Sequence, residues 1–220
     1  MAGQPKVQSI MLLNANNSQL VLVDYQARLM PVIFENELVI ANAVRLARMA
    51  GLLKVPVWGT EQNPDKLGLN LPELQAAIEF AGGRTLAKMH FSAVADGLVD
   101  WLRPPARQTS AGAAALNRPE LQKTSKAPAA CRSTIVMAGC EAHVCLLQTA
   151  LELLELLEVE EYDVWVVTDA SSSRTQRNRD AAFDRLARAG ASLVTTEMVA
   201  FEWARSCEHP AFRDLLRLVK

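Results

Sequence analysis

Short, continuously apolar runs alternate with amphipathic stretches along most of this 220-residue chain. The apolar runs are predicted to form buried strands over 19–23, 55–59, 84–88, 133–138, 163–167 and 191–195. Apolar residues at helical spacing predict helices over 38–53, 73–80, 96–102, 146–157, 179–189, 199–205 and 211–218. Strands that are apolar throughout and alternate with helices are typical of a parallel sheet with both faces covered. The sequence therefore predicts an α/β fold.

Local signals refine this pattern at three places. Pro56 either weakens the prediction of the second strand or lies near the start of that strand. Asp96 is expected to cap the helix over 96–102. Between residues 103 and 132 the composition turns to Ala, Pro, Ser, Thr and Gln without periodicity, which predicts an inserted flexible loop. Half of all residues are hydrophobic, enough to bury a sizeable core. We therefore expect one domain over residues 1–220.

Composition excludes several classes of protein. A net charge of −1 with interspersed Arg and Glu lacks the basic excess of a nucleic-acid-binding protein. The apolar run over 10–13 is too short for a membrane span or a signal peptide. Four cysteines without a Cys-x-x-Cys pair do not form a dense disulfide framework. We expect a cytoplasmic protein without membrane or nucleic-acid partners.

Cys145 falls in the first turn of a predicted helix that follows a buried strand. At such a position the unpaired backbone N–H groups and the positive end of the helix dipole favour the nucleophilic thiolate. The alternative is a buried, inert cysteine, because Cys is among the most buried residue types.

Other polar residues also end the predicted strands, and the carboxyl ends of parallel strands meet at one edge, where ligands bind. These residues are Asp24, Glu61, Gln62, Lys88 and Asp169. A carboxylate, an ammonium group and a thiol at this edge form a nucleophile with its base and a charge partner. For Asp24 and Lys88, each considered alone, the alternative to a catalytic role is that of a solvated surface residue. Asp169 precedes three serines and is predicted to be a turn or cap residue.

These residues stand within motifs that resemble a known family. The segments 22–26 (Leu-Val-Asp-Tyr-Gln), 88–92 (Lys-Met-His-Phe-Ser) and 139–145 (Gly-Cys-Glu-Ala-His-Val-Cys), in this order, resemble the isochorismatase-like cysteine hydrolase superfamily. Segments 60–68 and 169–174 are most similar to the isochorismatase domain-containing proteins. The resemblance covers nearly the whole chain outside 103–132. It implies a Rossmann-like three-layer sandwich, in which helices flank both faces of a six-stranded parallel sheet.

The resemblance also implies a catalytic machinery. Cys145 would be the nucleophile, Asp24 the general base that takes its proton, and Lys88 the residue that balances the charge. The backbone N–H groups of Glu141 and Cys145 would form an oxyanion hole, shaped by a cis peptide bond between Cys140 and Glu141. The thiolate would attack a carbonyl, expel an amine or ammonia, and leave a thioester that water hydrolyses.

The substrate class follows from the same resemblance. Hydrolysis of the vinyl ether of isochorismate does not require a thiol, so Cys145 favours a small amide, carbamoyl or related acyl substrate and a C–N amidohydrolase activity. The substrate pocket is expected to include Tyr25, Glu61, Phe91 and His143. Family members are commonly homodimers or larger homo-oligomers, so we expect the same here.

The chain departs from the nicotinamidases of this family at their metal site. Those enzymes carry an Asp-x-His-x-x-His motif after the second strand, whereas residues 60–66 here contain no histidine. We therefore expect no metal and no other cofactor. His143, two residues before Cys145, is an alternative base.

Two other classes of function stay open. A ribonuclease-type activity has been attached to some relatives, and here Arg174, Arg177 and Arg179 favour it, although such arginines are also typical of a solvated face. A non-catalytic binding protein of the same fold is the second alternative, against which the joint presence of Asp24, Lys88 and Cys145 argues.

Overall fold

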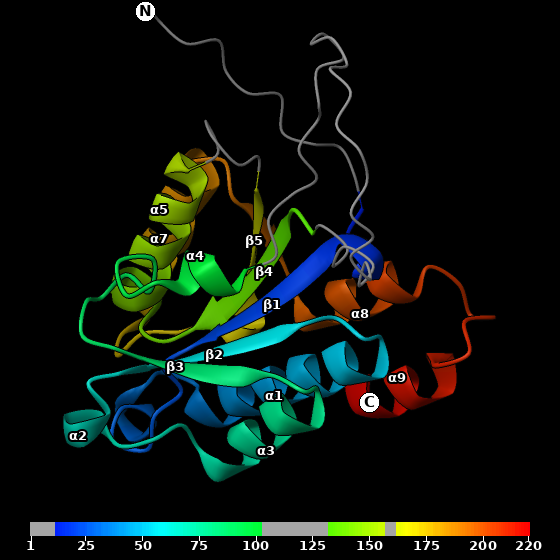
Figure 1. Ribbon diagram of the computed structural model, residues 1–220, viewed down its shortest axis with the longest axis horizontal. Coiled ribbons are helices and arrows are strands. Elements are labelled where there is room, and N and C mark those ends of the chain that lie inside the picture. Colours follow the sequence, from blue (N-terminus) through cyan, green and yellow to red (C-terminus); the bar gives the residue numbers. More distant parts are fainter. Residues whose placement is uncertain (1–11, 103–131, 157–161) are drawn as a thin grey trace, which may run out of the picture.

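A computed structural model describes residues 12–102, 132–156 and 162–220, and within them six strands form one parallel sheet (Figure 1). The order across the sheet is β3-β2-β1-β4-β5-β6. The strands are β1 (Ser18–Val23), β2 (Val57–Gln62), β3 (Arg84–Lys88), β4 (Thr134–Gly139), β5 (Asp163–Val167) and β6 (Ser192–Val194). The predicted α/β fold with a six-stranded parallel sheet is confirmed.

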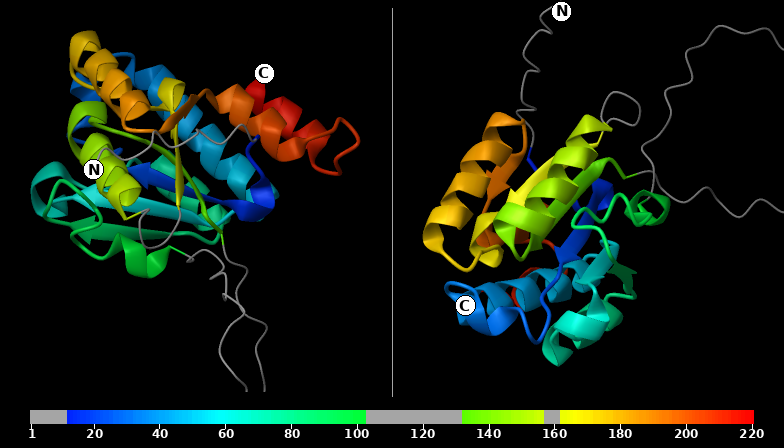
Figure 2. Two further views of the ribbon diagram at one scale, coloured as in Figure 1. Left: turned by 90° about the horizontal axis from the view of Figure 1, so that it is seen from above. Right: turned by 90° about the vertical axis from the view of Figure 1, so that its left-hand side faces the viewer.

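Helices cover both faces of the sheet, as Figures 1 and 2 show. One face carries α1 (Asn36–Leu52), α3 (Pro72–Phe80), α8 (Thr196–Ala204) and α9 (Phe212–Val219). The other carries α4 (Leu98–Trp101), α5 (Leu147–Glu155) and α7 (Gln176–Arg188). The short helix α2 (Pro64–Leu67) lies in the connection between β2 and α3. None of the helices in the described ranges is long and apolar enough to cross a membrane.

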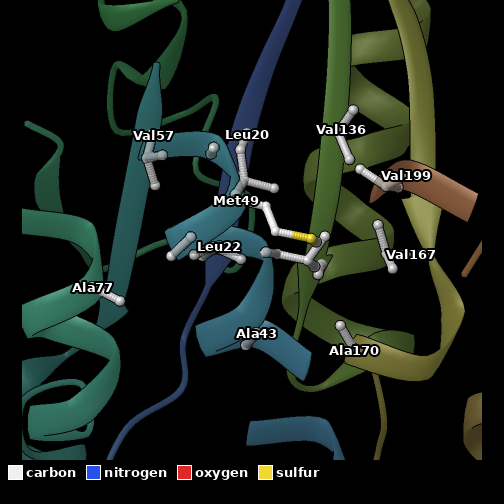
Figure 3. Packing of buried hydrophobic residues seen from close by; sticks show 14 of the residues in the cluster. Leu20, Leu22, Ala43, Met49, Val57, Ala77, Val136, Val167, Ala170 and Val199 are labelled. Carbon is white, nitrogen blue, oxygen red and sulfur yellow. The ribbon is translucent and has the colours of Figure 1, made fainter. Parts of the chain in front are cut away.

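The two central strands anchor the core. Every residue of β1 and β4 is buried, because both strands are paired on both edges and covered on both faces. Side chains alternate between the faces: Leu20 and Leu22 join the cluster under α1, whereas Val21 and Val23 join the cluster under α5. Figure 3 shows Leu20 and Leu22 in the first of these clusters together with Met49 of α1.

Several boundaries differ from the prediction, and local contacts explain three of the differences. Strand β2 begins after Pro56, whose carbonyl accepts a hydrogen bond from Leu20 N (2.8 Å) but which has no N–H of its own to donate. Helix α7 begins at Gln176, three residues early, because the Thr175 side chain caps it by accepting from Asn178 N. The prediction that Asp96 caps a helix is wrong. Gly97 precedes α4, and the Asp96 carboxylate instead accepts from the backbone N–H groups of residues 89 and 90.

The predicted loop over 103–132 falls almost entirely outside the described residues and stays a prediction. Its last residue, Arg132, is described and is not part of a loop on the surface. It is buried, and its guanidinium donates to the carbonyls of Ala15 and Ser18 beside the start of β1.

Candidate active site

Three residues that are distant in the sequence meet at the carboxyl edge of the sheet. Asp24 follows β1, Lys88 is the last residue of β3, and Cys145 lies in a π-helical turn (Ala142–Leu146) between β4 and α5. Asp24 has φ 56°, in the left-handed region that Asp and Asn tolerate best after Gly, so the chain turns sharply as it leaves the sheet. The Asp24 Oδ2 to Lys88 Nζ distance is 2.8 Å, and both side chains are fully buried.

Neighbouring groups fix this buried ion pair. Asp24 Oδ1 accepts a hydrogen bond from Thr60 Oγ1 of β2 (2.7 Å). Lys88 Nζ donates to Gln62 Oε1 (2.7 Å) and to the carbonyls of Phe91 (3.1 Å) and His90 (3.3 Å). A charged pair with no access to water persists only where such polar partners replace its hydration.

The Cys145 thiol lies beside this pair, with Sγ 3.9 Å from Gln62 Oε1. Burial raises the pKa of Cys145 to about 12, the negative charge of Asp24 raises it as well, and the positive charge of Lys88 opposes both effects. The expectation that the helix start favours a resting thiolate is therefore wrong. With its pKa raised in this way, the resting group at neutral pH is a neutral thiol, so its proton must leave during the reaction.

Two residues expected in the substrate pocket lie elsewhere. Tyr25 is fully buried in the cluster under α1, on the opposite face of the sheet from Cys145, and its hydroxyl donates to Ala170 O (2.6 Å). Glu61 is buried and its Oε1 accepts from Asn70 N (2.7 Å), which holds the connection between β2 and α3. We leave both residues out of the proposed pocket.

The other two pocket residues lie closer to the predicted triad. Phe91 is 54% exposed, and its carbonyl accepts from Lys88. His143 shares the π-helical turn with Cys145, but both of its ring nitrogens are engaged, Nδ1 with Ser173 Oγ (2.9 Å) and Nε2 with Asn178 Nδ2 (3.4 Å). Since two positions along a helical turn point side chains in different directions, His143 is a poor candidate for the base.

Gln62 and Thr60 also belong to this site. The sequence predicts that Gln62 lies at this edge together with Glu61, but it indicates only Glu61 as a pocket residue. Side chains alternate along a strand, so Thr60 and Gln62 of β2 share one face and Glu61 takes the other. Thr60 contacts Asp24, and Gln62 contacts both Lys88 and Cys145. The alternation was a signal available in the sequence.

The backbone around Glu141 has the cis peptide bond that the family resemblance implies, between Cys140 and Glu141. Adjacent amides are engaged: Ala142 N donates to Ser172 O (2.7 Å), and Val144 N donates to Glu141 O (3.0 Å). The Glu141 carboxylate accepts from Arg174 Nε (2.9 Å). The oxyanion-hole role of the amides of Glu141 and Cys145 stays a prediction.

Asp169 lies in a 3-10 turn (Thr168–Ala170), in agreement with the prediction of a turn or cap residue, whereas the N-cap of α8 is Thr195. Asp169 Oδ1 accepts from Thr196 N (2.8 Å) and Thr196 Oγ1 (2.9 Å) at the start of α8. Across the residues that the structure describes, no group of three or more His, Cys, Asp and Glu side chains has the arrangement of a metal site.

Comparisons with known proteins agree with this architecture. The isochorismatase domain family matches residues 18–198. Isochorismatase domain-containing protein 2 of Bos taurus is 34% identical over 204 residues, which are 93% of this chain and 83% of that protein. The MAR1 ribonuclease of Caenorhabditis elegans superposes with a TM-score of 0.77 at 28% identity, covering 95% of this chain and 92% of the other.

A third structure shares the fold at lower identity. It is the YcaC gene product of Escherichia coli, described as an octameric hydrolase of unknown specificity. Its TM-score is 0.70 at 24% identity, covering 98% of this chain and 97% of the other. The match over most of the chain, together with the similarity to isochorismatase domain-containing protein 2, confirms the resemblance found in the motifs: this chain belongs to the isochorismatase family.

Proposed function

We propose that this protein is a cysteine hydrolase that cleaves the C–N bond of a small amide, carbamoyl or related acyl substrate. The observation that carries the proposal is the fully buried Asp24–Lys88 pair beside the Cys145 thiol. Burying two charges has a large desolvation cost, so a buried ion pair is weak evidence for stability alone. Its position next to a nucleophilic side chain supports a role in chemistry.

Proton transfer in this mechanism accompanies the attack. Asp24 accepts the thiol proton while Cys145 Sγ forms a bond to the substrate carbonyl carbon, whose oxygen becomes an oxyanion received by the amides of Glu141 and Cys145. When this intermediate collapses, the C–N bond breaks, and the leaving nitrogen takes the proton from Asp24. A water molecule then attacks the thioester, gives its proton to Asp24, and releases the acid; the Cys145 sulfur leaves and regains that proton. Lys88 compensates the carboxylate charge throughout.

The first test is a screen of small primary amides and carbamoyl compounds, read out as release of ammonia. We expect a hit to be hydrolysed by the wild type and by Cys207→Ala, which removes an exposed thiol, but not by Cys145→Ala. The nucleophile provides the covalent route, so its loss should lower turnover at least a hundredfold. Hydrolysis that persists in Cys145→Ala would contradict the proposal.

We further propose that activity needs no metal or other cofactor, because residues 60–66 lack the histidines of the nicotinamidase metal site. Turnover of the substrate found in the screen is expected to be unchanged after dialysis against a chelator, as followed by ammonia release and by elemental analysis. One tightly bound zinc per chain, with activity lost on its removal, would refute this.

The assembly and location remain proposals as well. The octameric relative supports a homo-oligomer, which light scattering of the purified protein would measure. A cytoplasmic location is still a prediction from the sequence, since a related protein of Phytophthora sojae is described as a secreted isochorismatase effector.

Two of the three arginines that favoured the ribonuclease alternative are paired with carboxylates. Arg174 is bound to the Glu141 carboxylate, and Arg179 bridges Glu35 and Asp180. Arginines paired with carboxylates in this way provide little free positive charge for a phosphate backbone. The name of the C. elegans relative therefore does not change the proposal.

A further inference from the structure

The side-chain amide of Gln62 connects the buried ion pair to the thiol. Its Oε1 lies 2.7 Å from Lys88 Nζ and 3.9 Å from Cys145 Sγ, and its Nε2 donates to Met89 O (2.8 Å). Because an amide nitrogen only donates and a carbonyl oxygen only accepts, the bond to Met89 fixes which end of the amide faces the site. The oxygen therefore points at Lys88 and Cys145.

The backbone of Gln62 is held separately from its side chain. Gln62 N donates to Oε1 of the buried Gln26 (2.8 Å), and Gln26 Nε2 donates to Gln62 O (3.0 Å). Gln26 also donates to Gly68 O (2.6 Å). A substitution of the Gln62 side chain thus leaves the end of β2 anchored.

The contacts of Lys88 show what the amide does. An ammonium group has three N–H donors, and those of Lys88 are directed at Gln62 Oε1 and the carbonyls of His90 and Phe91. Asp24 Oδ2 lies 2.8 Å from Nζ as a charge contact, but it receives none of these aligned hydrogen bonds from Lys88. The ammonium therefore compensates the charge of Asp24 while leaving a lone pair of Oδ2 open.

We propose that Gln62 is a positioning residue: its oxygen takes one N–H of Lys88, so that Asp24 Oδ2 stays open to accept a proton, and it accepts the S–H of the resting Cys145. The role rests on the proposed hydrolase mechanism, in which Asp24 is the base. Gln62 itself forms no bond with the substrate and exchanges no proton.

Removing the oxygen has two opposite consequences. In Gln62→Met, which preserves side-chain length, the released N–H of Lys88 turns to Asp24 Oδ2 and weakens the base. The neutral thiol also loses its acceptor while the positive charge of Lys88 remains, so the thiolate forms more easily. We expect slower turnover together with faster alkylation.

The experiment measures the alkylation of Cys145 by iodoacetamide between pH 7 and 10, with mass-spectrometric mapping of each cysteine. Loss of one hydrogen bond corresponds to a change of ~3- to 10-fold, so Gln62→Met is expected to alkylate faster than wild type by this factor at pH 8. Gln62→Glu retains an acceptor but adds a negative charge and is expected to alkylate more slowly. Gln75→Met, a glutamine on α3 bound to Glu79 and Thr85, is the matched control and is expected to equal wild type.

Faster alkylation of Cys145 in Gln62→Met together with slower alkylation in Gln62→Glu supports a positioning role, because general damage to the site would speed alkylation in both variants. The fully buried Cys140 reports such damage, since only a loosened fold would expose it. If both variants alkylate like wild type, or both alkylate faster together with Cys140, the inference is overturned.

Turnover separates this inference from the proposed function. On a substrate from the screen, Gln62→Met is expected to lower kcat at least ~10-fold with little change in KM. If alkylation responds as described but no amide or carbamoyl compound is hydrolysed, Gln62 positions the thiol and the substrate class is wrong. If amides are hydrolysed and both Gln62 variants retain wild-type kcat, the proposed function holds and the role of Gln62 is refuted.

Discussion

Replacing Asp24 by Asn is expected to lower turnover by about a hundredfold or more, because the variant keeps the shape of the side chain but cannot accept the thiol proton. Asn also tolerates the left-handed backbone at this position (φ 56°), so the loss reports chemistry and not a backbone change. Lys88→Met is expected to reduce turnover to a similar extent, since it leaves the carboxylate uncompensated. Because the two residues act on the same step, the double variant should be little worse than either single variant.

The single variants are expected to lose stability as well as turnover, but the double variant is expected to recover part of the stability. Each single substitution leaves one buried charge without its partner, at a cost of about 3–5 kcal/mol in the free energy of unfolding. The double variant Asp24→Asn with Lys88→Met removes both charges, so it should be more stable than either single variant.

Urea unfolding and steady-state kinetics on the same preparations test both statements. Losses of turnover that multiply in the double variant would place the base elsewhere. A double variant less stable than both single variants would mean that the charges do not compensate one another.

Gly139→Ala is expected to destabilise the protein by about 3 kcal/mol or more, the upper range for overpacking a core. Gly139 ends β4 in register with Val23 of β1, and an added Cβ would lie 2.5 Å from Val23 Cβ and even nearer to Val23 O. Neither strand can move aside, because both are central in the sheet and Cys140 N donates to Val23 O (2.9 Å).

Gly190→Ala is the matched control for this substitution. Gly190 has φ 100° but nothing within 4 Å of an added Cβ, so only a conformational cost of about 1–2 kcal/mol is expected. Thermal and urea unfolding of the two variants should therefore rank Gly139→Ala well below Gly190→Ala. Equal stability would show that the close approach of β1 and β4 relaxes without cost.

The sequence predicted the central strands well because they are buried on both faces. Apolar runs predicted β1 and β4 to within a residue at each end and β5 with its correct bounds. The predicted bounds of β3 are also correct, although Lys88 is its only buried residue. The errors arose where one side-chain contact decides a boundary. Asp96 has the residue type and position typical of a helix cap, but its carboxylate accepts hydrogen bonds from the backbone N–H groups of residues 89 and 90, which precede it in the chain.

For the candidate site, the sequence predicted which strand ends meet. The direction of each side chain was harder to predict, since adjacent residues at a strand end face opposite sides of the sheet. Asp24 faces Lys88, whereas Tyr25 packs in the core cluster under α1. The pKa of Cys145 could not be obtained from its position at a helix start alone. Burial depends on packing, and here its effect on the pKa exceeds that of the positive charge of Lys88.

The central position of β1 bears on how the protein opens. Amide hydrogens of β1 and β4 are protected by neighbours on both edges and by helices on both faces, so their exchange with solvent requires unfolding of the whole sheet. Asp24 directly follows the last residue of β1, so its carboxylate is attached to the region that is expected to exchange most slowly. Fluctuations that fray the edge strands β3 and β6 would then leave the base in place, whereas the Lys88 ammonium, at the end of an edge strand, would be the first group of the buried pair to meet deuterated solvent.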